Sequence, residues 1–163
     1  MIRVESLTLT RGERQILGPL SFVLGQASWL SVVGAHGAGK STLLRLMAGL
    51  DVPSGGDVKL RDQPVTGIAP LNRAQYVGYL AQSSVTSFPF TVEEYVSLGL
   101  APHDEKMFNH LDVMDAVIES LTLGELRKRK VLGLSGGEFQ RVRLARVLAQ
   151  VWFEPDQRVL ILD

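Results

Sequence analysis

The sequence predicts an α/β fold with a largely parallel sheet, and three observations support this prediction. Strand-like and helix-like segments alternate along the chain, as in sheets that are covered by helices. A glycine-rich turn at residues 34–39 follows an apolar strand-like segment and precedes a helix-like one. The last apolar run, residues 159–162, indicates a short buried strand.

The N-terminal half contains most of the predicted strands. Apolar residues alternate in part over residues 2–9, which predicts two short strand pieces, and another strand is predicted at 20–24. Residues 29–33 are mostly apolar and predict the strand before the glycine-rich turn. Apolar residues at helical spacing predict a helix over 41–50. Two more short strands are expected, at 58–60 and 77–80.

The middle of the chain is predicted to be helical. Thr91 and Glu94 form a capping box that begins a helix ending at about residue 98, and Ser135 and Glu138 form a second capping box. The helix after the second box directs apolar residues inward: Val142, Ala145, Leu148, Ala149 and Trp152. An apolar stripe between the boxes predicts the buried face of an amphipathic helix: Met107, Leu111, Met114, Ile118 and Leu121.

Composition excludes several classes of protein. The chain has 163 residues with 17 Lys and Arg against 17 Asp and Glu, so it lacks the basic excess of a nucleic-acid-binding protein. It has no cysteine, which excludes disulfides and thiolate metal sites. No apolar run approaches the roughly 18 residues of a membrane span, and no signal peptide is visible at the N-terminus.

A phosphate-binding loop is predicted between the strand at 29–33 and the following helix. The pattern G-x-x-x-x-G-K-[ST] is matched by Gly34, Ala35, His36, Gly37, Ala38, Gly39, Lys40 and Ser41, and Thr42 follows. Glycines let the backbone approach a phosphate closely, and successive N–H groups at a helix start attract anions. In this pattern the lysine reaches the β- and γ-phosphates and the serine hydroxyl binds Mg²⁺.

A second anion site is predicted at the start of the helix that follows Ser135. Two adjacent glycines, Gly136 and Gly137, expose backbone N–H groups there, and Glu138 completes the capping box. Two anion sites about a hundred residues apart in one chain require an explanation. The sequence L-S-G-G-E that contains them resembles the signature motif of the ATP-binding subunits of ABC transporters, with Glu138 in place of the usual glutamine.

Two further motifs strengthen this resemblance. The strand at 159–162 with Asp163 resembles the Walker B strand, and Gln82 falls where the family has its Q-loop glutamine. The resemblance implies a P-loop NTPase fold, with a RecA-like core, an antiparallel β subdomain and an inserted helical subdomain. It further implies three divisions, 1–90 for the β subdomain and the first part of the core, 91–152 for the helical subdomain and 153–163 for the Walker B strand.

The resemblance also implies a mechanism and partners. ATP and Mg²⁺ are the expected cofactors, with Lys40, Gln82 and Asp163 in catalytic roles and Ser41, Gln82 and Asp163 near the metal. A second copy of the chain, arranged head to tail, would complete each ATP site with its Ser135 and the two glycines. Transmembrane permease subunits and, indirectly, a periplasmic binding protein are the other expected partners, at the cytoplasmic face of the membrane. No nucleic acid is expected.

Other segments resemble one branch of the family, the hemin importers, with siderophore and cobalamin importers as near relatives. The segments are 87–94, which begins with Ser87, 98–103 and 144–150. Phe88 and Phe90 are interpreted either as core residues or, with equal weight, as the lining of a groove for the permease. The expected function is therefore ATP-driven uptake of hemin or a related iron chelate, although the sequence does not fix the cargo.

Several positions depart from the family pattern. Arg11 stands where an aromatic residue usually stacks on adenine. Two interpretations of Arg11 stay open: its guanidinium stacks on the purine, or it is a solvated surface arginine. His36 replaces a frequent asparagine and is expected to point outward. His103 and His110 are not expected to bind heme, since an importer ATPase does not touch the cargo. The basic run 127–130 is interpreted as a solvated loop face.

The largest departure follows Asp163, where the family continues with a catalytic glutamate and a switch histidine. The sequence is therefore interpreted as a truncated product or a fragment, incomplete at the C-terminus, with a missing central strand and with ATP binding but no turnover. Two alternatives to an importer subunit stay open: a soluble ABC ATPase outside transport, and a nucleotide-binding fragment without activity.

Overall fold

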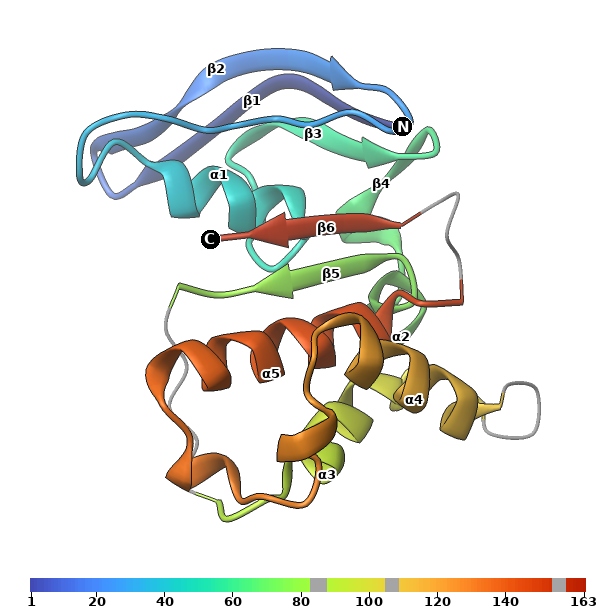
Figure 1. Ribbon diagram of the computed structural model, residues 1–163. Helices are drawn as coiled ribbons and strands as arrows, with labels where there is room; N and C mark the ends of the chain where they lie inside the picture. The colour runs from blue at the N-terminus through green and yellow to red at the C-terminus, as the bar shows by residue number, and fades with distance from the viewer. Residues whose placement is uncertain (83–87, 105–108, 154–157) are drawn as a thin grey trace. The chain divides into compact units, whose positions relative to one another are not determined.

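The computed structural model describes residues 1–82, 88–104, 109–153 and 158–163, which form two compact units (Figure 1). One unit comprises Met1–Arg73 with Asp163, and the other comprises Ala74–Leu162. Ser87 and Met107, which the sequence placed in a family motif and in an apolar stripe, lie outside the described residues. The predicted divisions at residues 90 and 152 differ from the units and stay predictions.

An antiparallel sheet with the strand order β2-β1-β3-β4 forms most of the first unit. Its strands are β1 (Ile2–Arg11), β2 (Arg14–Leu24), β3 (Gly55–Leu60) and β4 (Gln63–Pro64). The two strand pieces predicted in residues 2–9 are one continuous strand with a pairing irregularity after Val4. Ser6 has a φ of 46° there, and this resets the alternation so that Val4 and Leu7 both face the core.

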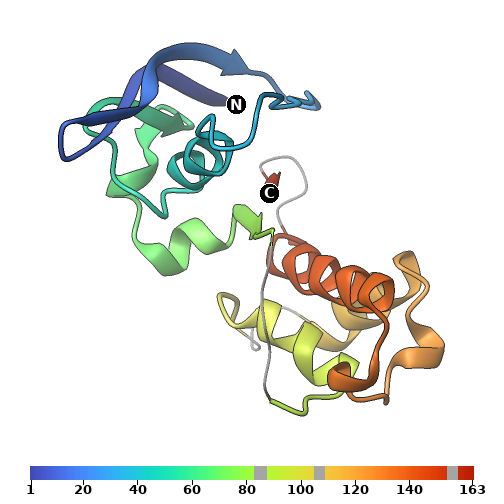
Figure 2. The ribbon, with the colours of Figure 1, turned by 90° about the vertical axis from the view of Figure 1, so that its left-hand side faces the viewer.

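Helix α1 (Lys40–Met47) lies beside this sheet (Figure 2) and confirms the helix predicted after the glycine-rich turn. Leu43, Leu46 and Met47 are its buried residues. The short elements η1 (Val65–Gly67) and α2 (Pro70–Ala74) follow the sheet.

The strand predicted at residues 29–33 does not form, so this prediction was wrong for the structure. Trp29 is 95% exposed and Val33 is 89% exposed, and no described strand pairs with this segment. An isolated extended segment has no ladder hydrogen bonds and no face to bury, which explains why its apolar sequence alone does not make it a strand.

A parallel strand pair and a helical layer form the second unit. Strands β5 (Val77–Leu80) and β6 (Val159–Leu162) run in the same direction (Figure 1), with Leu80 opposite Leu162. Both strands were predicted. The interpretation of β6 as wholly buried was wrong, because Ile161 is buried whereas Leu160 and Leu162 are 39% and 51% exposed. Parallel pairing is confined to these two of the described strands, so the largely parallel sheet is not observed.

The helical layer contains α3, α4 and α5, with bounds Val92–Ser97, His110–Ser120 and Gly136–Gln150, and the short elements η2 (Leu98–Leu100), η3 (Gly124–Leu126) and η4 (Val131–Gly133). Both predicted capping boxes are present, at Thr91 and at Ser135. In α4, Met114 and Ile118 are buried as predicted, but Leu111 is 70% exposed, which makes that part of the stripe wrong. Val113 and Val117 complete the buried face together with Met114 and Ile118.

Helix α5 is buried on two sides. Val142, Ala145 and Ala149 lie in the helical core as predicted, with Leu148 and Trp152 packed against it. On its other side, Val147 and Val151 contact Gly78 of β5 so closely that a Cβ at Gly78 would lie 2.7 Å from Val147 Cγ1. The helix that begins at the signature motif is therefore pressed directly against the strand that leads to Gln82.

Candidate functional site

The phosphate loop joins the exposed segment before it to helix α1. Gly39 is the N-cap residue, with a φ of 88°, and an added Cβ there would lie 2.9 Å from the Ile16 carbonyl oxygen. Both the backbone conformation and the available space therefore require glycine at this position. No side chain caps the helix, so the first N–H groups of α1 remain without a side-chain partner.

Lys40 folds its side chain over this loop. Its Nζ donates hydrogen bonds to the carbonyl oxygens of Gly34 and Ala35, at 2.9 and 2.8 Å. The loop residues His36, Gly37 and Ala38 are exposed, so the loop is open on its outer side. The ammonium group therefore lies at the loop, and its contact with the β- and γ-phosphates stays a prediction.

Ser41 contacts the predicted Walker B aspartate. The Ser41 hydroxyl donates a hydrogen bond of 2.7 Å to Asp163 Oδ1, across a sequence separation of 122 residues. A hydroxyl oxygen and a carboxylate oxygen at this distance are ligands that suit Mg²⁺, which binds few protein oxygens and keeps several waters. The residues present therefore fit the metal that the motif predicts.

The predicted Q-loop residue follows the neighbouring strand. Leu80 and Leu162 are paired in the parallel ladder, Gln82 follows β5 by two residues, and Asp163 follows β6 directly. Chemistry in open α/β sheets concentrates at the carboxyl ends of the strands. Gln82 is exposed at this end.

The signature segment begins helix α5 with a complete capping box. Ser135 Oγ accepts a hydrogen bond from the Glu138 N–H at 3.3 Å, and the Ser135 N–H donates to Glu138 Oε2 at 2.7 Å. The serine hydroxyl still has its own hydrogen to donate. At Gly136 and Gly137 an added Cβ would meet no described atom within 4 Å, so packing within this chain does not explain either glycine.

Glu138 is held at the cap by charge and hydrogen bonds. Its hydrogen bonds with the side chain and backbone of Ser135, with a smaller contribution from nearby arginines, lower its pKa from the ordinary 4.5. Arg129 Nη1 lies 3.8 Å from Glu138 Oε1. The carboxylate is therefore turned toward the cap and Arg129, and binding of an anion by the N–H groups of Gly136 and Gly137 stays a prediction.

A family model described as ABC transporter matches residues 17–163. The chain belongs to the ABC transporter family. The hemin import ATP-binding protein HmuV of Pseudomonas entomophila (strain L48) is 39% identical over 163 residues, which are 100% of this chain and 64% of that protein. The protein of the same name from Myxococcus xanthus (strain DK1622) is 40% identical over 167 residues and covers 99% of this chain and 62% of its own length.

Solved structures agree with this ABC family assignment. A structure described as an inward-facing conformation of a metal-chelate type ABC transporter has a TM-score of 0.73 and 28% identity, and covers 91% of this chain and 56% of that chain. The structure of cbiO1 from Clostridium perfringens, part of the ABC transporter complex cbiONQ, has a TM-score of 0.80 at 23% identity, which supports the fold. This chain spans about two thirds or less of the length of these proteins.

Membership of the ABC family implies a nucleotide-binding domain, and the predicted P-loop NTPase fold is confirmed. No described helix is both long and apolar enough to cross a membrane. The adenine contact predicted for Arg11 stays a prediction. Its Nη2 lies 3.7 Å from Asp51 Oδ2, which also pairs with Arg45, and its side chain is 67% exposed.

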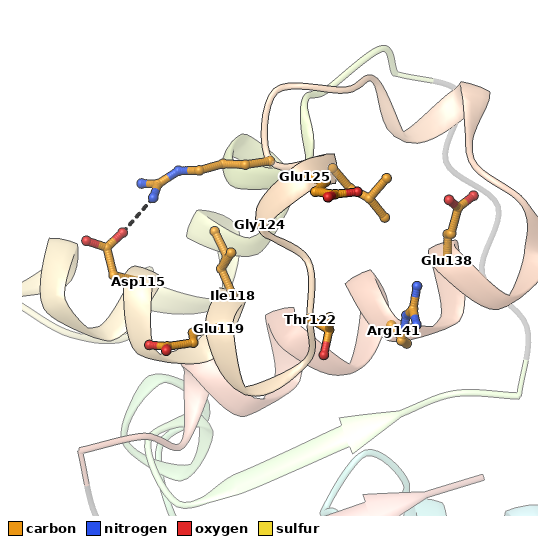
Figure 3. Close-up of a pocket in the computed structure, with 10 residues that line it drawn as sticks. Asp115, Ile118, Glu119, Thr122, Gly124, Glu125, Glu138 and Arg141 are labelled. Atoms are coloured by element: carbon orange, nitrogen blue, oxygen red, sulfur yellow. Dashed lines mark hydrogen bonds and ion pairs between the residues drawn. The ribbon is translucent and has the colours of Figure 1, made fainter.

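A hollow of about 660 Å³ lies beside the signature helix of this ABC domain (Figure 3). Four carboxylate residues line it, together with Arg127 and Arg141: Asp115, Glu119, Glu125 and Glu138. Arg127 pairs with Asp115 at its edge, at 2.6 Å. An anionic triphosphate would be repelled by these carboxylates, so the hollow is not the nucleotide site.

The two histidines with a potential heme interpretation lie in the second unit. His103 is buried, its Nε2 lies 2.7 Å from the Gln150 carbonyl oxygen, and its ring packs edge-on against Phe153. The ring of His110 lies 6.2 Å from the same phenylalanine. Within the described ranges, no group of three or more His, Cys, Asp or Glu residues could hold a metal ion.

Two features near the site were missed at the sequence level. Asp51 joins Arg45 and Arg11, and the hydrogen bond with Arg45 lowers its pKa below the ordinary 3.8. Arg143 is 5% exposed and donates to the Ala81 carbonyl oxygen, directly before Gln82. The available signal was an arginine on the face of α5 that also carries Val147 and Gln150, where an apolar residue would be expected.

Proposed function

We propose that this chain is part of the ATP-binding subunit of a bacterial ABC importer for hemin or a related iron chelate. The observation that carries the proposal is the phosphate loop, in which Lys40 covers Gly34 and Ala35 and Ser41 meets Asp163. The cargo class is supported by relatives named hemin import ATP-binding protein at 37–40% identity. In the proposed assembly the complete protein hydrolyses ATP.

In this proposal the loop holds the triphosphate through its backbone. The N–H groups at the start of α1 and the Lys40 ammonium bind the β- and γ-phosphate oxygens, which replace the loop carbonyls as partners of Nζ. Ser41 and Asp163 would hold Mg²⁺, and Gln82 would sense the metal and the attacking water. When bound, Mg²⁺ would neutralise negative charge on the β- and γ-phosphates.

The signature segment would act on the ATP of a second copy arranged head to tail. The N–H groups of Gly136 and Gly137 and the Ser135 hydroxyl are donors at the positive end of a 15-residue helix. The open space around both glycines supports a close approach from outside the chain. These donors would stabilise the charge on the γ-phosphate in trans.

The proposed transport partners are membrane permease subunits, which would receive the protein at the cytoplasmic face, and indirectly a periplasmic binding protein. Phe88 is 64% exposed and its ring lies 4.9 Å from that of Phe90, which packs against the helical core. This arrangement supports both interpretations of the pair, because Phe90 anchors the segment and Phe88 is available to a permease helix.

The phosphate loop is tested by replacing its lysine. ATP binding to the 163-residue chain with Mg²⁺ should weaken severely in Lys40→Ala, because no other loop side chain supplies a cation. The matched control is Lys130→Ala, which removes an exposed lysine of the second unit. Equal affinity of wild type and Lys40→Ala in a calorimetric titration would remove the proposal. We expect residues 1–163 to bind ATP without turnover, as a phosphate-release assay would show.

A further inference from the structure

Side-chain hydrogen bonds join helix α5 to the segment of strand β5 at both ends of the strand. At one end, Gln150 Nε2 donates to the carbonyl oxygens of Ala74 and Val77, at 2.8 and 3.0 Å. At the other end, Arg143 Nη2 donates to the carbonyl oxygen of Ala81. Arg143 and Gln150 are seven residues apart, which is about 10.5 Å along a helix. The strand between the two accepting carbonyls, those of Val77 and Ala81, is about 13 Å long. The helix therefore runs along the whole strand.

Arg143 is an unusual side chain for joining a helix to a strand. Its side chain is buried, and its charge has no carboxylate partner among the residues that the structure describes. Nη1 donates to Gln140 Oε1 at 2.8 Å, and Nη2 donates to the Ala81 carbonyl oxygen. Nε has no hydrogen-bond partner among the described residues. A buried cation with neutral partners is costly compared with an apolar side chain of the same size, so packing alone does not account for it.

The two groups that Arg143 joins are both parts of the proposed ATP site. Ala81 directly precedes Gln82, and Arg143 lies on the helix that begins at Ser135 and the signature glycines. Between the two fastenings, Gly78 allows direct contact of β5 with Val147. A movement of the signature helix would therefore carry the Ala81 carbonyl, and with it the backbone that sets the position of Gln82.

We propose that Arg143 is a positioning residue that couples Gln82 to the signature helix. It is not one of the residues proposed to contact the nucleotide or the metal. It acts through the Ala81 carbonyl, so that Gln82 reaches its working position only when α5 is in place. The inference rests on the proposed function, because it assigns Gln82 to the metal and the attacking water.

The test uses the complete protein that contains this chain. Arg143→Met keeps the length of the side chain but removes its charge and donors. It should lower kcat for ATP by about tenfold, the effect of one lost charged hydrogen bond, and change the ATP dissociation constant less than about twofold. Arg143→Lys keeps the charge and one donor to Ala81 and should give an intermediate kcat. Arg146→Met is the control, because Arg146 lies on the same helix over Tyr95, 5.2 Å from its ring centroid.

Two measurements separate positioning from a merely structural role. In a Gln82→Ala background, Arg143→Met should cause no further loss of kcat, because both changes disable the same group. Independently of ATP hydrolysis, hydrogen exchange of residues 77–82 should be faster in Arg143→Met than in wild type and unchanged in Arg146→Met.

Three results would overturn the inference. The first is a double variant whose loss of kcat is the product of the losses in Arg143→Met and Gln82→Ala. The second is unchanged hydrogen exchange of residues 77–82 in Arg143→Met. The third is failure of both Arg143→Met and Arg143→Lys to fold, which would make the arginine structural. The proposed function fails separately, if ATP binding does not depend on Lys40. If ATP binding depends on Lys40 but the effects of Arg143 and Gln82 are not coupled, the proposed function stands and only this inference fails.

Discussion

At the scale of single residues, the basic run at 127–130 is mostly exposed, as predicted, and it also forms ion pairs. Arg127 Nε pairs with Glu93 Oε2 at 2.9 Å, and Lys128 pairs with the other oxygen of the same carboxylate. A backbone hydrogen bond joins the same two residues, because the Glu93 N–H donates to the Arg127 carbonyl oxygen at 3.1 Å. Lys128, Arg129 and Lys130 are exposed, as predicted. In addition, the side chains of Arg127 and Lys128 hold the start of α3 through Glu93.

Glu93 should therefore make stability depend on acidic pH. Hydrogen bonds from Lys128 and then Arg127 lower its pKa from the ordinary 4.5. A carboxyl group with a lowered pKa in the folded state stabilises that state above its unfolded pKa, and the contribution is lost as pH falls through the folded pKa. The loss should begin below pH 4.5.

The measurement is the urea midpoint of unfolding from about pH 5 to about pH 3. Wild type should lose more stability over this range than Glu93→Gln, which cannot titrate. Glu119→Gln removes an exposed carboxylate of α4 that forms no ion pair with the residues that the structure describes, and it should keep the pH dependence of wild type. Identical pH profiles for wild type and Glu93→Gln would show that the pair contributes nothing measurable.

At the scale of elements, contact between η2 and α5 depends on a missing side chain. A Cβ at Gly99 would lie 2.1 Å from the Arg146 carbonyl oxygen and 3.3 Å from Ala149 Cβ. The nearest atom belongs to the backbone of α5, which cannot rotate away as a side chain could. Glycine is needed here for close packing and not for its backbone conformation, since Gly99 has no positive φ.

Gly99→Ala should therefore destabilise the chain by about 1–3 kcal/mol, the usual cost of overpacking. Gly124→Ala is the control, because Gly124 also lies in a 3₁₀ helix but has open space within 4 Å. That variant should be neutral or more stable by about 0.4–1 kcal/mol, through the unfolded state. Similar urea midpoints for the two variants would contradict the contact that separates them.

Elements with a local signal could be predicted from sequence, and those that depend on a partner could not. Thr91 and Ser135 have their capping partners three residues away, so both helix starts were read correctly. Residues 29–33 have a strand-like sequence but no paired strand, and sequence alone does not supply one. In the site, the loop motif placed Lys40, whereas Arg143 was missed because its acceptor is 62 residues away.

At the scale of the whole molecule, the proposed ATP site is divided between two kinds of group. The loop and Asp163 belong to one unit of the chain, and the signature donors belong to the other. In the head-to-tail proposal each ATP takes the first kind from one copy and the second kind from its partner. Binding by a single copy and assembly of two copies should therefore respond to different substitutions.

Ser135→Arg in the complete protein separates the two steps. A single copy should still bind ATP nearly as well as wild type, because the loop around Lys40 is untouched. ATP-driven dimerisation, measured by light scattering, and hydrolysis should be abolished, because the bulky side chain covers the N–H groups of Gly136 and Gly137. Ser120→Arg adds the same group at the end of α4 and should change neither.

Loss of the helix cap must be distinguished from this blockage. Ser135→Ala removes the Oγ that accepts from the Glu138 N–H and should cost about 1 kcal/mol of stability, as N-cap serines do. It leaves the two glycines accessible, so dimers should still form with ATP, although more weakly. Hydrolysis at the wild-type rate in Ser135→Arg would exclude the signature segment from the site of the second copy, because an arginine side chain there leaves no room for the γ-phosphate.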